Sequence, residues 1–235
     1  DSFILFRPKD IVSGDFYWMD HKDDITYFTA ADCTGHGVPG AFVSLVGANG
    51  LNRSVNGYQL RSPGLILDKL TELVEQTFKK RKDGMDIALC ALDMKEMTLQ
   101  YAGANNPLWI IRETGNVLIV NDEEIEPNIA EEKYSLYEIK ADKQPIGYFD
   151  MRKPFKNNVV NAQKGDRVYI FSDGYPDQFG GDKGKKLKIA VLKRLLLDIH
   201  QKPMSEQKSF LEKYMREWMG THEQIDDICL IGFRV

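Results

Sequence analysis

The chain has 235 residues, of which 43% are hydrophobic and 28% charged, and its formal net charge at pH 7 is −4. This length suits one large domain or two small ones, and it can bury a core without a disulfide or a metal. The composition is that of a globular protein and excludes a disordered or fibrous chain. The net negative charge argues against general nucleic-acid binding.

The cysteines indicate a reducing compartment. Cys33, Cys90 and Cys229 form no CxxC pair, so neither a disulfide framework nor a cysteine-based zinc site is expected. No apolar run is long enough to span a bilayer, and the first residues lack the basic region of a signal peptide. We therefore expect a cytoplasmic protein and, because the chain does not begin with Met, a domain excised from a longer regulatory protein.

Three short strands are expected first. Residues 3–6 are apolar, and residues 15–19 and 25–30 are rich in aromatic and β-branched side chains. The polar residues 21–24 separate the second and third strands, which predicts a β-hairpin.

Two helices are expected next. The first is predicted to start at Pro39, a residue suited to a first helical position, and to run through the apolar residues Phe42, Leu45, Val46 and Leu51. Small residues line it (Gly40, Ala41, Ser44, Gly47 and Ala48), so another element could approach it closely. The second is predicted over residues 63–82, with Ser62 as its N-cap.

The middle of the chain is rich in β-structure. Apolar runs at 87–92, 98–102, 108–111 and 117–120 follow one another with turns between them, which predicts an antiparallel meander. Residues 121–132 carry six acidic residues and no basic one, and we expect a solvated loop there.

The last third is predicted to contain a strand at 168–171, a helix around 189–199, a helix around 210–218 and a final strand at 228–233. With no repeat and no linker in the sequence, we expect a single α+β domain over residues 1–235.

Acidic residues stand at the ends of several predicted strands. Asp15 opens one strand, Asp32 and Asp173 each close one, and the pair Asp226 and Asp227 precedes the last. Strand ends can converge in space, and converging carboxylates repel one another unless cations lie between them. Such a set of oxygen ligands favours Mg²⁺ or Mn²⁺.

Each of these signals has a simpler interpretation. An Asp-Gly pair after a strand, as at Asp173, is usually a turn. Asp32 could cap the following helix, and Asp226-Asp227 could be a solvated pair in a loop. From the residues alone, the prediction stops at an α+β domain with the metal site as one open interpretation.

Longer motifs resemble a known family. Residues 9–18 (KDIVSGDFYW) and 30–41 (AADCTGHGVPGA) resemble the bacterial phosphatase domain named after stage II sporulation protein E (SpoIIE), a branch of the metal-dependent protein phosphatase (PPM) superfamily. Further matches follow in order across essentially the whole chain, at 101–107, 144–147, 164–166, 171–174 and 226–228.

The resemblance implies an αββα sandwich of two antiparallel sheets and the hydrolysis of phosphoserine or phosphothreonine in proteins. Two Mn²⁺ or Mg²⁺ ions about 3.5–4 Å apart would activate a water near neutral pH. Asp15 and Asp32 are the implied catalytic residues. The implied ligands are Asp32 as the bridge, Asp15 and the Cys33 carbonyl on one ion, and Asp173 and Asp226 on the other, with Asp227 as the alternative to Asp226.

Two features depart from the wider superfamily. Its eukaryotic members have an acid-role His two residues after the bridging Asp, whereas His36 lies four residues after Asp32, so we expect His36 to be structural. The phosphate-binding Arg of those relatives has no clear match, and Arg7 is not assigned to that role.

The resemblance also implies partners: a phosphorylated substrate of the anti-anti-sigma type and an upstream sensory or receiver domain. Helices 39–52 and 63–82 could receive such a regulator or could simply form the outer layer. Two other functions stay open, an inactive binding module on the same fold and a phosphohydrolase acting on a small metabolite. A deep apolar pocket would favour the metabolite, and a shallow open cleft would favour a protein substrate.

Overall fold

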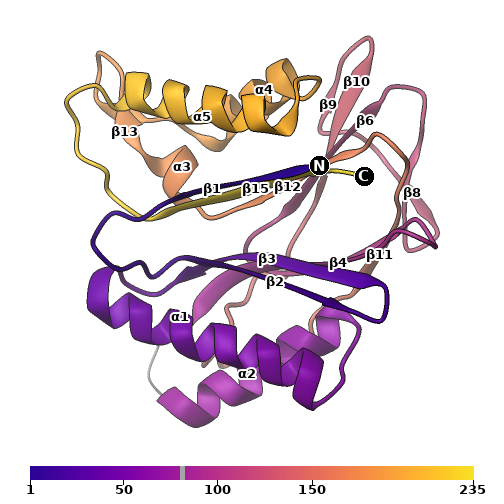
Figure 1. Ribbon diagram of the computed structural model, residues 1–235, viewed down its shortest axis with the longest axis vertical. Coiled ribbons are helices and arrows are strands. Elements are labelled where there is room, and N and C mark those ends of the chain that lie inside the picture. The colour runs from indigo at the N-terminus through magenta and orange to yellow at the C-terminus, as the bar shows by residue number, and fades with distance from the viewer. Residues whose placement is uncertain (80–82) are drawn as a thin grey trace.

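The computed structural model describes residues 1–79 and 83–235. Two antiparallel sheets stack face to face, and helices cover the outer face of each (Figure 1). The expected αββα sandwich is thus confirmed. The six-stranded sheet has the order β1 (Ser2–Arg7), β15 (Ile228–Arg234), β12 (Arg167–Phe171), β6 (Leu108–Glu113), β10 (Tyr134–Ile139) and β9 (Ile129–Ala130). The seven-stranded sheet has the order β2 (Phe16–Lys22), β3 (Ile25–Cys33), β4 (Met85–Asp93), β5 (Thr98–Ala104), β11 (Asn158–Asn161), β7 (Leu118–Val120) and β8 (Glu123–Ile125).

Each outer layer consists of two long helices. On the seven-stranded sheet lie α1 (Gly37–Asn52), which continues into a π-helical turn at Arg53–Gly57, and α2 (Pro63–Phe78). On the six-stranded sheet lie α4 (Ile189–Ile199) and α5 (Met204–Met219). The short helix α3 (Gly174–Asp177) and the small hairpin of β13 (Phe179–Gly180) and β14 (Lys185–Lys186) follow β12. Within the described residues, no helix combines the length and the apolar character needed to cross a membrane.

The main core lies between the two sheets, where side chains from both inner faces meet. Phe28 and Tyr101 of one sheet are buried with Ile110, Val168 and Ile231 of the other. Two further apolar layers lie under the helix pairs. Burial of both faces of each sheet explains why many strands read as continuous apolar runs.

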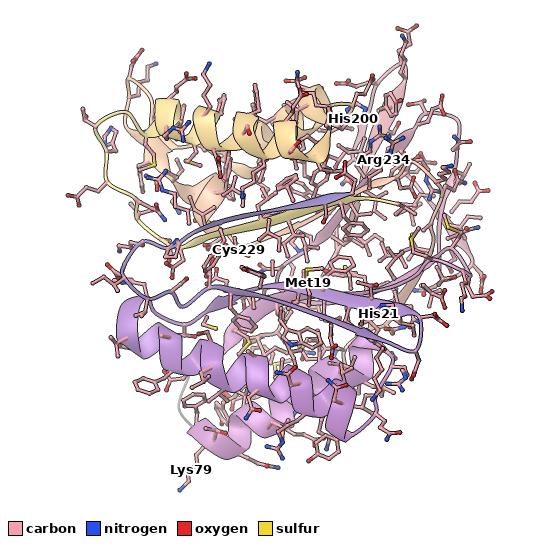
Figure 2. All side chains as sticks on the ribbon, in the orientation of Figure 1. Met19, His21, Lys79, His200, Cys229 and Arg234 are labelled. Carbon is pink, nitrogen blue, oxygen red and sulfur yellow. The ribbon has the colours of Figure 1, made fainter. Side chains whose placement is uncertain are left out.

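The predicted hairpin is confirmed. β2 pairs with β3 from Phe16 opposite Ala31 to Lys22 opposite Ile25. Asp23 and Asp24 form the turn with φ of 49° and 65°, a conformation that Asp tolerates better than most residues. Figure 2 labels Met19 and His21 on this hairpin.

The first helix differs from the prediction. It begins at Gly37 rather than Pro39, and Phe42 and Leu45 are 63% and 67% exposed instead of forming the packed face. The buried face consists of three glycines and two apolar side chains: Gly40, Gly47, Gly50, Val43 and Leu51. A Cβ at Gly47 would lie 2.6 Å from the Met85 Cε. The glycines therefore let α1 approach the sheet closely, which turns its larger apolar side chains outward.

The second helix begins at Pro63 as expected, but the Ser62 side chain makes no capping hydrogen bond. Its last helical residue is Phe78, followed by Lys79, which Figure 2 labels. The remainder of the predicted helix, residues 80–82, lies outside the described part of the chain.

The predicted meander is wrong beyond its first pair. β4 and β5 pair with each other, but β6 lies in the other sheet between β12 and β10, and β7 pairs with β11. The segment 121–132, expected to be a loop, contains the short strands β8 and β9. These partners come from distant parts of the chain, so the spacing of apolar runs could not identify them.

Candidate active site

The predicted acidic residues lie at one edge of the sandwich. Asp15 directly precedes β2 and Asp32 is the penultimate residue of β3, while Asp173 follows β12 and Asp226 precedes β15. In Figure 1 the β1–β2 loop, the start of α1, the α3 turn and the start of β15 gather at the left-hand edge. Two segments of this set come from each sheet, so the site spans both halves of the fold.

Asp15 is buried, at 3% exposure. Burial raises the pKa of its carboxyl to about 8; a hydrogen bond with Ser172 opposes the shift, and the charges of Asp227, Asp226 and Asp173 add to it. The Asp15 Oδ2 atom is buried and has no hydrogen-bond partner in the described residues. An unpartnered buried carboxyl oxygen is costly and marks a position where a ligand could complete the site.

Asp32 and Asp173 interact directly. Burial, followed by the charges of Asp15 and Asp173, raises the pKa of Asp32 to about 9. The pKa of Asp173 is also raised, first by partial burial and then by the charges of Asp177 and Asp226, and a hydrogen bond with Asp32 opposes this shift. The two carboxyls thus lie close enough for each to influence the pKa of the other.

Asp226 and Asp227 have different surroundings. Asp227 is 2% exposed, and its carboxylate accepts hydrogen bonds from the backbone N–H groups of Lys9 (2.7 Å), Gly14 (2.8 Å) and Asp15 (3.4 Å). Its oxygens thus tie the β1–β2 loop to the last strand. The Asp226 Oδ1 accepts a hydrogen bond from the Asp227 N–H at 2.9 Å. Among the described residues, the Asp226 carboxylate accepts no other hydrogen bond, so its Oδ2 does not tie loops together as Asp227 does.

Cys33 is buried at the end of β3, and burial raises the pKa of its thiol well above the ordinary range. The thiol is therefore neutral and unsuited to act as a nucleophile. Its carbonyl oxygen faces Gly14: a Cβ at Gly14 would lie 3.4 Å from it and would collide with the carbonyl oxygen of Gly35. The absence of a side chain at Gly14 thus allows the β1–β2 loop to contact the turn between β3 and α1.

Asp86 is a member of the site that the sequence reasoning missed. It lies opposite Asp32 in the β3–β4 register, and the Asn105 Nδ2 donates to its Oδ1 at 2.8 Å. Burial raises the pKa of Asp86, and the charge of Asp173 adds to it. Together, Asp32, Asp86 and Asp173 line a polar cavity of about 230 Å³ with Tyr148 at its wall. The available signal was that Asp86 opens one strand just as Asp32 closes its neighbour.

His36 lies at the start of α1 with half of its side chain exposed. Its Nδ1 pairs with the Asp10 Oδ2 at 2.8 Å, and its Nε2 lies 3.3 Å from the Lys9 Nζ. Both ring nitrogens thus contact the β1–β2 loop. Arg7, left unassigned above, ends β1 and lines a different cavity beside α5, with Glu212 among its neighbours.

The chemistry of the donor set suits a divalent cation. Carboxylate oxygens are the ligands that Mg²⁺ and Mn²⁺ prefer, and the raised pKa values and the unpartnered Asp15 Oδ2 are what a missing positive charge would produce. As the side chains stand, the described His, Cys, Asp and Glu residues include no group of three or more that could hold a metal ion. The residues nevertheless fit a divalent cation in their chemistry.

This fold and this acidic edge define a PPM-type phosphatase domain. The chain belongs to the SpoIIE family, because the family model for stage II sporulation protein E matches residues 22–235. No curated protein has a detectably similar sequence.

Solved structures show the same fold. The chain is similar to the SiaA-PP2C domain of Pseudomonas aeruginosa, with 27% identity and a TM-score of 0.84 over 100% of this chain and 85% of that one. It also resembles the PP2C phosphatase domain of SpoIIE from Bacillus subtilis, with 14% identity and a TM-score of 0.74 over 100% of this chain and 62% of that one. The RsbU and RsbW domains of a Mycobacterium tuberculosis protein match with 15% identity and a TM-score of 0.74, over 100% and 59%.

Proposed function

We propose that the chain is a Mn²⁺- or Mg²⁺-dependent protein serine/threonine phosphatase. The observation that carries the proposal is the meeting of Asp15, Asp32, Asp173 and Asp226 from four separate segments, with the Asp15 Oδ2 buried and unpartnered among the described residues. Membership of the SpoIIE family supports the reaction class.

Each residue has a role in this proposal. Asp32 would lie between two cations, Asp15 and the Cys33 carbonyl would hold one of them, and Asp173 and Asp226 would hold the other. When bound, the cations would supply an acidified water and neutralise charge on the phosphoryl group.

The protons on the carboxyls determine when cations can bind. With pKa values of about 8 and 9, Asp15 and Asp32 must each lose a proton on binding, so we expect metal affinity to rise with pH through this range. Asp227, with its oxygens bonded to the β1–β2 loop, would hold the loop that carries Asp15.

The surroundings of the site favour a macromolecular substrate. The cavity at the carboxyls is small and polar, unlike the larger, mostly apolar pockets that enclose small ligands. Val38, Phe42 and Leu45 are exposed along α1, and Ile11 is fully exposed in the β1–β2 loop. Exposed apolar residues of this kind are typical of protein-binding surfaces. We propose a phosphorylated protein of the anti-anti-sigma type as substrate and an upstream sensory or receiver domain as regulator.

The test is phosphate release from phosphoserine and phosphothreonine peptides, compared with p-nitrophenyl phosphate. We expect hydrolysis with Mn²⁺ or Mg²⁺ and loss of activity with EDTA or in Asp32→Asn. Asp122→Asn, an amide replacement at an exposed turn, serves as the matched control and should retain activity. Hydrolysis that survives both metal removal and Asp32→Asn would contradict the proposal. A folded protein that binds Mn²⁺ but hydrolyses nothing would favour the inactive binding module.

A further inference from the structure

The segment that carries Asp226 is not fixed by a helix or a strand. It comprises residues 222–227, between the end of α5 and the start of β15, and it contains no regular secondary structure. Within the described part of the chain, residues 223–226 form no hydrogen bond between backbone groups. In Figure 1 this segment, drawn in yellow, lies at the same left-hand edge as α3. Side chains must therefore fix the position of Asp226.

Gln178 binds this segment through its side-chain amide. The side chain is fully buried; its Nε2 donates to the Glu223 carbonyl at 2.8 Å, and its Oε1 accepts the Ile225 N–H at 3.1 Å. Nε2 also donates to the Phe179 carbonyl at 3.0 Å. The reversed amide would place its oxygen against two carbonyl oxygens, so only this orientation satisfies the partners. A buried amide with both donors and its acceptor in use holds the segment in one geometry.

The backbone of Gln178 is itself fixed at the acidic edge. Gln178 directly follows α3, and α3 begins directly after Asp173. The Gln178 carbonyl accepts hydrogen bonds from the Trp218 Nε1 and from the Leu187 N–H, both at 3.0 Å. The amide that binds the segment therefore projects from an anchored position one short helix away from Asp173.

α3 contacts the same segment at its first residue. A Cβ on Gly174 would lie 1.9 Å from the Asp227 carbonyl oxygen, so the two backbones touch there. The segment is thus joined to α3 at Gly174 and again just beyond its end, at Gln178. Because Asp173 directly precedes α3, these two contacts relate the position of Asp226 to that of Asp173.

Gln224 holds the segment from another direction. Its Nε2 donates to the carbonyls of Arg7 and Asp226, both at 2.8 Å. This ties the segment to the end of β1 and leaves its position relative to α3 to Gln178 and the Gly174 contact.

We propose that Gln178 is a positioning residue that sets the separation of Asp173 and Asp226 for a divalent cation. The inference rests on the proposed function, in which these two carboxylates hold one of the two cations. Mg²⁺ demands near-octahedral ligand geometry, and the loss of a residue that orients metal ligands typically weakens metal binding by 10- to 100-fold. Gln178→Met keeps the length of the side chain and removes all three hydrogen bonds of the amide.

Gln207 provides a matched control. It is also fully buried, and its Nε2 also donates to two backbone carbonyls, those of His200 at 3.0 Å and Lys202 at 2.9 Å. Its Oε1 accepts one hydrogen bond, from the Tyr169 Oη at 2.8 Å. Figure 2 labels its neighbour His200 at the end of the six-stranded sheet away from Cys229 and the acidic edge. Gln207→Met thus removes the same hydrogen bonds at the same burial, but far from the acidic site.

The first test is calorimetric titration of the metal-free whole chain with Mn²⁺ at pH 8, alongside thermal melts in EDTA. We expect the two Met variants to lose similar stability in EDTA. Only Gln178→Met should bind one Mn²⁺ at least about tenfold more weakly than the wild type while binding the other normally. Should Gln178→Met not fold, Gln178→Asn, which keeps the amide on a side chain one methylene shorter, takes its place with the same expectation.

The second test is hydrogen exchange in EDTA, which needs neither metal nor activity. Backbone N–H groups of residues 223–227 should exchange at least about tenfold faster in Gln178→Met than in the wild type, and at the wild-type rate in Gln207→Met. Wild-type Mn²⁺ affinities in Gln178→Met, or equal losses of affinity in both Met variants, would overturn the proposal. A wild type that binds no Mn²⁺ would instead contradict the proposed function. The exchange rates would still decide whether Gln178 positions the segment of Asp226: faster exchange supports that role, and unchanged exchange overturns it.

Discussion

Replacing Asp32 by Asn should stabilise the metal-free protein. The folded structure raises the pKa of Asp32 from 3.8 to about 9, so at pH 7 the folded protein holds a proton that the unfolded chain releases. Because pH 7 lies about three units above the unfolded-state pKa of 3.8, keeping Asp32 protonated in the folded state lowers the free energy of unfolding by up to about 4 kcal/mol. Asn has the shape of the protonated acid and does not carry this cost.

The sign of the pH dependence follows from the raised pKa. The contribution of the protonated Asp32 carboxyl to folding stability is fully present below pH 4. It is lost as the pH rises toward 9, at roughly 1.4 kcal/mol per pH unit. The free energy of unfolding of the wild type should therefore fall more steeply with pH than that of Asp32→Asn. The two proteins should be closest in stability near pH 4 to 5 and furthest apart near pH 8.

The assay is urea unfolding of both proteins in EDTA at pH 5, 6.5 and 8, repeated in millimolar Mn²⁺. Mn²⁺ should reverse the order, because a ligand at a hundredfold excess over its Kd stabilises the wild type by about 2.7 kcal/mol and the variant by less. Parallel pH dependences in EDTA, together with equal Mn²⁺ shifts, would refute the reasoning. Asp32 would then be an ordinary residue at the end of a strand.

Three further predictions concern the same edge. Phosphatase activity should require Mn²⁺ or Mg²⁺ and return when the metal is restored after chelation, as followed by phosphate release. At equal folding, Asp32→Asn should lower that activity by about a hundredfold or more and His36→Ala by much less; the reverse order would assign His36 a direct role. Asp227→Asn should destabilise the fold by about 1–3 kcal/mol with or without metal, whereas Asp226→Asn should lower Mn²⁺ affinity alone, as measured by thermal melts and calorimetry.

Local pattern predicted much of the fold. The β2–β3 hairpin could be predicted because two aromatic, β-branched strands flank a short polar turn, all within adjacent residues. The helix α4 carries apolar residues at helical spacing, and most of them are buried against the six-stranded sheet. In α5 the aromatic residues Phe210, Tyr214 and Trp218 are only partly buried beside that core. The positions of the acidic residues relative to the strands were also readable, because strand ends are local features.

The burial of individual residues and their contacts within the site could not be predicted from the sequence. The sequence indicated that small residues such as Gly40 and Gly47 allow a close approach to α1, but not that Phe42 and Leu45 face outward, because hydrophobicity alone does not say which apolar side chains are buried. The different surroundings of Asp226 and Asp227 depend on backbone N–H groups more than 200 residues away. Asp86 joined the set only through its pairing opposite Asp32.

The sequence by itself determined the kind of each main element and which residues of the acidic set stand at strand ends. Only the tertiary structure decided which sheet each strand joins. β6 pairs with β10 and β12 rather than with β5 and β7, its neighbours in sequence. β1 pairs with β15, from the other end of the chain. The physical reason is that strand identity depends on side chains that are neighbours in sequence. Strand pairing depends on backbone hydrogen bonds, which every residue type except proline can donate, and on packing between distant segments.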